Sequence, residues 1–188
     1  TTWGIIPALI LMPLQYIKGQ FIPTFYLSIL FSSMNIVLMY LLLIRIKREF
    51  LGQMSSFGIC IFLILFAFGT TQFYVGTLGS VWHVDQIVTS FLGMVGTYII
   101  FRKKRKFIHY LASIVFFSAT LLGRPTNVLL CLLPITLYIC DPSVRAMLTF
   151  ANKMRAVFVR QIILLCLPFL FFLSIFFLFN YVRFNNPL

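Results

Sequence analysis

The arginine in "LLGRPTNVLL" is the side chain of this sequence best suited to bind an anion. Between Phe107 and Cys140 the basic side chains are His109 and Arg124, and no acid occurs in that stretch. A charge in such apolar surroundings is costly and often serves function. Pro125 is typical of the first position of a helix, which predicts Arg124 at a helix N-terminus, where anions bind. The structural alternative is an arginine that snorkels to lipid headgroups from a tight turn.

Four other polar side chains next to apolar runs are candidates for substrate binding: His83, Asp85, Tyr181 and Arg183. His83 and Asp85 are two positions apart and do not share a helix face, which disfavours a metal pair. Asp85 is also a candidate salt-bridge partner for an arginine, and Arg183 follows an aromatic residue, as interface anchors do. We predict an outward-opening polar cavity that holds His83, Asp85, Arg124 and Arg183.

The composition is typical of an integral membrane protein. The chain has 188 residues, of which 61% are hydrophobic and 10% are charged, against roughly 45–50% and about 25% in soluble domains. The net charge of +12 would suit nucleic acid, but the basic residues form short clusters between apolar runs. We therefore expect no nucleic-acid partner. The four cysteines lie in or beside apolar runs without metal-ligand spacing, which predicts neither a metal site nor a disulfide framework.

Six apolar segments have the length, or nearly the length, of a membrane span, which is about 20 residues with a range of roughly 17–25. Residues 4–17 are apolar, short and contain two prolines, which favours an interfacial helix. Residues 141–160 mix basic and apolar side chains, which predicts an amphipathic helix on the cytoplasmic surface. The expected fold is an all-α polytopic bundle. Its spans are residues 24–44, 57–73, 83–101, 107–122, 126–140 and 161–181.

The basic residues assign sides to these spans. With six alternating crossings, twelve of the 15 Lys and Arg residues share one side, in "RIKRE", "RKKRK" and residues 145–160. The opposite side keeps Lys18, Arg124 and Arg183. The positive-inside rule makes the basic side cytoplasmic. We therefore expect Arg124 and Arg183 on the extracytoplasmic side of a multi-pass protein.

Four stretches together resemble the GT-C superfamily of integral-membrane glycosyltransferases, in particular bacterial relatives of the dolichyl-phosphate-mannose mannosyltransferases. "IIPALILMPLQYIKGQ" is similar to their apolar, proline-containing lead into a membrane helix. "GSVWHVDQIVTSFLGMVGTYIIFRKK" resembles a mid-chain outer loop and its following helix. "SATLLGRPTNVLLCLLPITLYI" resembles a recurrent arginine turn between paired helices. "LFNYVRFNNPL" is similar to an Asn-Tyr-x-Arg-Phe-Gly-Asn-Pro turn, with Asn185 in the place of the commoner glycine.

The resemblance implies a hexosyltransferase that passes a sugar from a polyprenyl-phosphate donor to an acceptor on the extracytoplasmic face, with inversion. It implies no resident cofactor, and its expected partners are membrane lipids and the lipid-linked sugar. The catalytic acidic residue is expected upstream of Thr1, so residues 1–188 would be one transmembrane domain, a fragment that lacks an N-terminal catalytic loop and a C-terminal part. The donor phosphate would be held by Arg124 first and Arg183 second, with Tyr181 and His83 as hydrogen-bond donors.

Two other classes of function remain open from the residues themselves. A transporter commonly places polar groups near the midplane and is built from two related halves. Here the polar residues gather toward one face and the sequence shows no internal repeat. A non-catalytic assembly subunit would use its aromatic spans for packing alone. An acidic pair after an upstream first span would favour the transferase.

Overall fold

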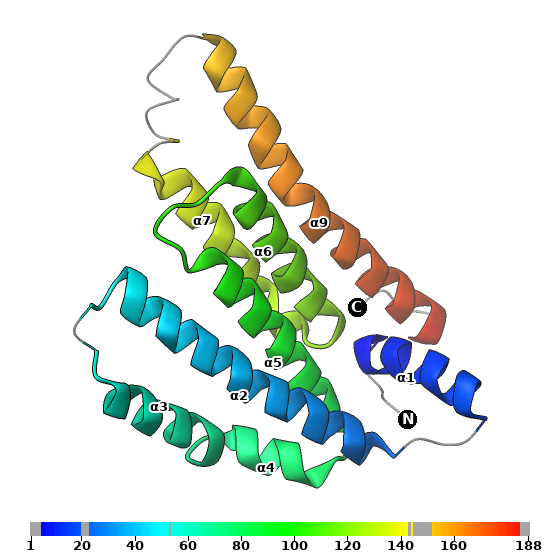
Figure 1. Cartoon of the computed structure of the whole chain (residues 1–188). Coiled ribbons are helices and arrows are strands. Elements are labelled where there is room, and N and C mark those ends of the chain that lie inside the picture. The colour runs from blue at the N-terminus through cyan, green and yellow to red at the C-terminus, as the bar shows by residue number, and fades with distance from the viewer. Residues whose placement is uncertain (1–4, 20–22, 53, 143, 145–151, 185–188) are drawn as a thin grey trace. The chain divides into compact units, whose positions relative to one another are not determined.

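The chain is all-helical in the part that the structure describes (Figure 1). The computed structural model shows helices joined by turns and no strand among the described residues, which confirms the predicted all-α class. Contacts divide the chain into two compact units, Thr1–Lys103 and Lys104–Leu188, and each is described by itself. The predicted single transmembrane domain stays a prediction. The described residues are 5–19, 23–52, 54–142, 144 and 152–184.

Unit 1 is organised around its longest helix, α2, which packs against α3, α4 and α5. Its short helices begin at good N-cap residues. The Ser55 hydroxyl accepts a hydrogen bond from the main-chain N–H of Gly58 at 3.0 Å, which caps α3. The helices of unit 1 are α1 (Ile5–Lys18), α2 (Thr24–Glu49), α3 (Ser56–Phe68), α4 (Thr71–Leu78) and α5 (Val81–Ile100).

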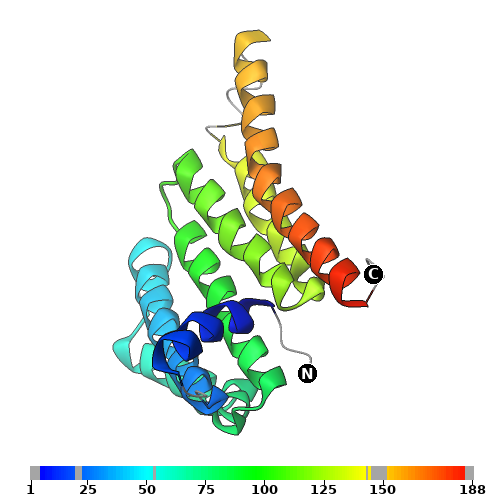
Figure 2. The same ribbon diagram turned by 90° about the vertical axis from the view of Figure 1, so that its right-hand side faces the viewer.

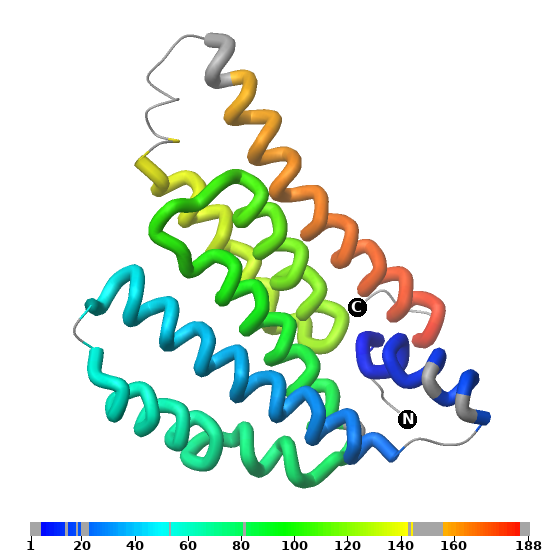
Figure 3. Tube along the Cα trace, viewed as in Figure 1, coloured from blue at the N-terminus to red at the C-terminus, as the bar shows by residue number. Residues whose placement is uncertain are grey.

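The predicted span over residues 57–73 is two helices rather than one. Helices α3 and α4 meet at an angle of 46° (Figure 3). Gly69 ends α3, and the hydroxyl of Thr70 accepts a hydrogen bond from the N–H of Gln72 at 3.2 Å, which starts α4. The pair is a broken span or a re-entrant loop. The Gly-Thr step carried the signal for this break, because glycine ends helices and threonine caps them.

Unit 2 is a helical hairpin with a long helix, α9, packed against its first arm. The first arm is α6 followed by η1, and the second is η2 followed by α7. Helix α9 continues through Pro168 as one helix. The elements are α6 (Phe107–Ala119), the 3-10 helices η1 (Thr120–Leu122) and η2 (Pro125–Cys131), α7 (Leu132–Cys140) and α9 (Asn152–Phe184).

Two helices are long and apolar enough to cross a membrane by themselves. They are α2, over Thr24–Glu49, and Ala156–Phe184 within α9, and the bent α3–α4 pair makes a third if it is one span. The spanning window of α9 has a mean hydropathy of 3.0 and only 6% of it is buried, as expected for a helix in contact with lipid. The chain is therefore membrane-associated. Helix α5 does not meet the same test, since its first turns carry His83, Asp85 and Gln86.

Two helices were predicted to lie on a membrane surface, over residues 4–17 and 141–160. Helix α1 forms over almost the predicted residues 4–17, and its interfacial position stays a prediction. The amphipathic helix over 141–160 is described only in part, because residues 143 and 145–151 lie outside the described residues. Residues 152–160 are the first turns of α9 and continue into its apolar stretch, where neither glycine nor proline occurs before Pro168. The surface helix over residues 141–160 therefore stays a prediction, and its described residues 152–160 are continuous with the rest of α9.

Candidate functional site

Arg124 lies in the turn that joins the two arms of the unit 2 hairpin. Its backbone is extended, with φ −139° and ψ 109°, and Pro125 is the first residue of η2, as predicted. The main-chain N–H of Arg124 donates to the carbonyl of Thr120 at 2.9 Å, and its own carbonyl accepts from the N–H of Asn127 at 3.0 Å. The side chain is half-buried. The expected helix start is confirmed in position, but a seven-residue 3-10 helix precedes α7 there.

Buried hydrogen bonds in the two arms next to this turn stabilise it. Thr120 is fully buried, and its hydroxyl donates to the carbonyl of Phe117 at 2.6 Å. Across the hairpin, the Ser118 hydroxyl and the Cys131 thiol are 3.7 Å apart, in hydrogen-bonding distance for sulfur. Both side chains are buried. These contacts fix the two arms on either side of Arg124 and so limit where its guanidinium can reach.

The C-terminal end of α9 lies at the same end of unit 2 as this turn. Both views show it, and α9 contacts η1 (Figures 1 and 2). Tyr181 is exposed near this end, and the guanidinium carbon of Arg183 is 5.8 Å and 5.1 Å from the ring centroids of Phe179 and Phe184. A cation in the last turn also favours the helix dipole. The structure thus brings Arg124, Tyr181 and Arg183 to one end of the unit, and the surroundings of Arg183 suit anchoring.

His83 and Asp85 belong to unit 1, in the first turns of α5. The Nδ1 atom of His83 shares a hydrogen bond with the Ser80 hydroxyl, and its ring meets that of Tyr74 edge to face, with centroids 5.8 Å apart. His83 therefore links α5 to α4. Asp85 is half-buried two positions further on, and the helix confirms that the pair does not share a face. The cavity predicted to combine them with Arg124 and Arg183 stays a prediction, because each unit is described by itself.

A buried polar stripe on α2 was missed by the sequence reasoning. The Ser28 hydroxyl donates to the carbonyl of Val75 on α4 at 3.3 Å, and the Asn35 amide donates to the carbonyl of Ile87 on α5 at 3.3 Å. Both side chains are fully buried. Between them, Ser32 accepts from the amide of Gln72 at 3.4 Å. The spacing of four and then three residues was a readable signal for one helix face.

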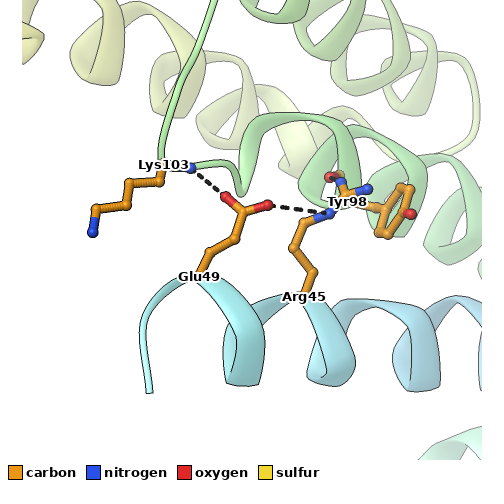
Figure 4. Close-up of polar contacts among 4 residues, drawn as sticks. All are labelled: Arg45, Glu49, Tyr98 and Lys103. Atoms are coloured by element: carbon orange, nitrogen blue, oxygen red, sulfur yellow. Dashed lines mark hydrogen bonds and ion pairs between the residues drawn. The ribbon is translucent and has the colours of Figure 1, made fainter. Parts of the chain in front are cut away.

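A second missed group ties α2 to the end of α5 (Figure 4). Arg45 donates to the main-chain carbonyl of Tyr98, and its guanidinium carbon lies 3.5 Å from the centroid of the Tyr98 ring. Glu49 lies 4.0 Å from Arg45 and accepts a hydrogen bond from the main-chain N–H of Lys103. The charge pattern of the sequence predicted only one role for Arg45, as one of the basic residues that set the membrane topology. Here it is part of a helix–helix contact.

The third missed group lies at the opposite end of the unit 2 hairpin from Arg124. The Tyr110 hydroxyl donates to the Asp141 carboxylate at 2.6 Å, and the Tyr138 hydroxyl bonds to Gln161. The rings of Tyr138 and Phe158 are stacked, with centroids 6.1 Å apart. These contacts join α6, α7 and α9, so the partly buried Asp141 has a packing role at this end.

Fold and sites together define an all-helical, membrane-associated chain with polar groups at its helix ends and on one buried helix face. No protein-family model, no curated protein and no solved structure matches it. Among the described residues, no three His, Cys, Asp or Glu side chains gather to hold a metal ion.

Proposed function

We propose that this chain is part of an integral-membrane glycosyltransferase that takes a sugar from a polyprenyl-phosphate donor on the extracytoplasmic face. One observation carries the proposal. A half-buried arginine is held in a hydrogen-bonded turn between two apolar helical arms. A lipid-linked phosphate places its anionic head at the membrane surface with its tail in the bilayer. A guanidinium at the end of an apolar hairpin has the charge and the position to bind that head.

The proposal includes six membrane crossings, and the helix lengths of unit 2 support it. A 3-10 helix rises about 2.0 Å per residue against about 1.5 Å in an α-helix. The arms Phe107–Leu122 and Pro125–Cys140 therefore reach about 25 Å and about 27 Å, close to the ~30 Å hydrocarbon core. The 3-10 turns lengthen two segments that are too short as pure α-helices. Arg124 then lies at one membrane surface and Arg105 at the other.

In the proposed reaction, an acceptor oxygen bonds to the anomeric carbon of the sugar while the bond from that carbon to the phosphate oxygen breaks. The acceptor proton passes to a base, and the lipid phosphate leaves with the electron pair. Negative charge grows on the departing phosphate, so Arg124 stabilises the transition state more than the bound donor. Arg183 supplies a second cation at the same end of unit 2. Tyr181, near the same end of unit 2, is proposed as a hydrogen-bond donor to the lipid-linked sugar.

A pair of substitutions separates phosphate binding from snorkelling. Lysine snorkels as arginine does, but it lacks the planar fork that binds two phosphate oxygens. In the full-length protein supplied with a polyprenyl-phosphate sugar, Arg124→Ala should lower the transfer rate by about 100-fold, and Arg124→Lys by about tenfold. The control is Arg160→Ala, an exposed arginine on α9, which should leave the rate unchanged. Normal transfer by both Arg124 variants would refute the phosphate role.

A further inference from the structure

We propose that unit 1 carries a binding site for one anionic phospholipid, in the groove between the end of α2 and the start of α3. Lys47 binds the lipid phosphate, and the apolar walls of the groove hold an acyl chain. The site involves none of the residues assigned to the sugar donor. It is a separate function of the chain, and it stands if the glycosyltransferase proposal fails.

The groove has the size and the lining of a ligand site. Its volume is about 350 Å³, within the range of roughly 300–1,000 Å³ that is usual for small-molecule pockets. Apart from one amine, two hydroxyl groups and one thiol, its walls are apolar. Lys47 is its only charged lining residue. The groove is lined by Tyr40, Ile44 and Lys47 of α2 and by Ser56, Ile59, Cys60 and Leu63 of α3.

Two polar groups of the groove, the Lys47 amine and the Ser56 hydroxyl, meet at the start of α3. The Lys47 amine donates to the Ser56 hydroxyl at 3.5 Å, a long contact that an anion can replace. Ser56 is the first residue of α3, so its main-chain N–H has no partner within the helix. An amine, a hydroxyl and a helix start at one place match the oxygens of a phosphate group.

The surroundings of the groove favour a lipid over a free anion. Helix α2 is long and apolar enough to span a membrane, and the neighbouring face of α3 exposes Phe57 and Phe62. These apolar surfaces beside the groove suit the acyl chain of a lipid. Arg48 and Lys103 are exposed at the same end of unit 1. Their charge draws anionic lipids toward this end, whereas the direct contact of Lys47 with a bound headgroup contributes about 1 kcal/mol.

The first test compares two lipids on the purified full-length protein by native mass spectrometry. Phosphatidylglycerol should bind more tightly than phosphatidylcholine, whose headgroup has no net charge. Lys47→Ala should weaken phosphatidylglycerol binding about fivefold, which corresponds to the loss of one lysine–headgroup contact. The matched control is Lys103→Ala, which removes the same charge from the same end but from outside the groove, and it should leave the affinity within about twofold.

The second test distinguishes a loss of lipid binding from a folding defect. Ser56→Asp places a carboxylate in the first turn of α3, which favours the helix dipole but repels a phosphate. This variant should keep or raise the thermal stability and lose phosphatidylglycerol binding. Cys60→Trp should reduce binding by filling the groove, with no change of charge. Equal affinities for the two lipids, unchanged binding in Lys47→Ala and Ser56→Asp, or displacement of the lipid by millimolar inorganic phosphate would each overturn the proposal.

Discussion

Arg45 on α2 packs against Tyr98 on α5 in two ways at once. Its guanidinium carbon lies 3.5 Å from the centroid of the Tyr98 ring, and the same group donates to the Tyr98 main-chain carbonyl. Tyr98 is in the last turn of α5, where carbonyls lack a partner within the helix. One side chain therefore stacks on an aromatic ring and completes a helix end. The contact fixes the basic ends of two helices that are distant in sequence.

Substitutions of Arg45 test this contact. Arg45→Ala removes both the charged hydrogen bond and the stacking, and it should lower the free energy of unfolding by about 2–3 kcal/mol. Arg45→Lys should cost less, about 1 kcal/mol, because an amine can still donate a hydrogen bond. The measurement is reversible unfolding in mixed micelles. Arg48→Ala is the control, since Arg48 is exposed on the same turn. Equal stability of all three variants and the parent would contradict a packing role.

Glu49 should matter as a hydrogen-bond acceptor more than as a charge. Its ion pair with Arg45 is 4.0 Å long and spans one helical turn, a geometry that contributes about 0.3–0.5 kcal/mol. It also accepts from the main-chain N–H of Lys103. Glu49→Gln keeps an acceptor and should cost about 0.5 kcal/mol, whereas Glu49→Ala should cost about 1–2 kcal/mol. Thermal unfolding in detergent compares the two, and equal losses would show that charge alone matters.

Gly76 allows α4 to approach α2 closely. A Cβ atom at this position would lie 2.6 Å from the Ser32 hydroxyl oxygen and 3.1 Å from its Cβ atom. Gly76→Ala should therefore lower the stability by about 1–3 kcal/mol, and a second substitution, Ser32→Gly, should restore part of the loss. Gly52→Ala is the control, since no atom lies within 4 Å of its added Cβ. A Gly76→Ala variant as stable as the control would contradict the close contact.

The Tyr110–Asp141 hydrogen bond should stabilise unit 2. At 2.6 Å it joins a buried hydroxyl to a carboxylate, and bonds to charged groups contribute about 1.5–3 kcal/mol. Tyr110→Phe removes the donor and should cost that amount, while Asp141→Asn retains an acceptor and should cost less. Tyr26→Phe, at an exposed tyrosine, should have no effect. Denaturation curves of the full chain measure all three, and a neutral Tyr110→Phe would contradict the assignment.

Hydropathy and local signals predicted much of the fold. The apolar runs predicted the helical class and located α2 and the apolar stretch of α9, because length and composition alone decide those two elements. Pro125 correctly predicted the start of a helix after Arg124. The break between α3 and α4 was missed, since an apolar run hides a Gly69–Thr70 step that acts through backbone geometry. The 3-10 form of η2 has no comparable signal in the sequence.

The site residues were harder to predict, because side-chain partners come from other helices. Charge counting placed Arg45 with its basic neighbours, and only the neighbouring α5 shows that it contacts Tyr98. His83 was selected as a polar residue near an apolar run, and its bond to Ser80 is local. By contrast, the spacing of Ser28, Ser32 and Asn35 was readable as one helix face. Their burial depends on α4 and α5, which the spacing alone does not reveal.

The side of the membrane on which Arg124 lies tests the account most directly. In a variant without its four native cysteines, Thr126→Cys and Lys104→Cys each add one thiol, at the hairpin turn and in the basic segment. A membrane-impermeant maleimide is applied to intact cells and to permeabilised cells. We predict labelling at position 126 in intact cells and labelling at position 104 only after permeabilisation. Labelling of both positions under the same condition would place Arg124 on the basic side and contradict the account.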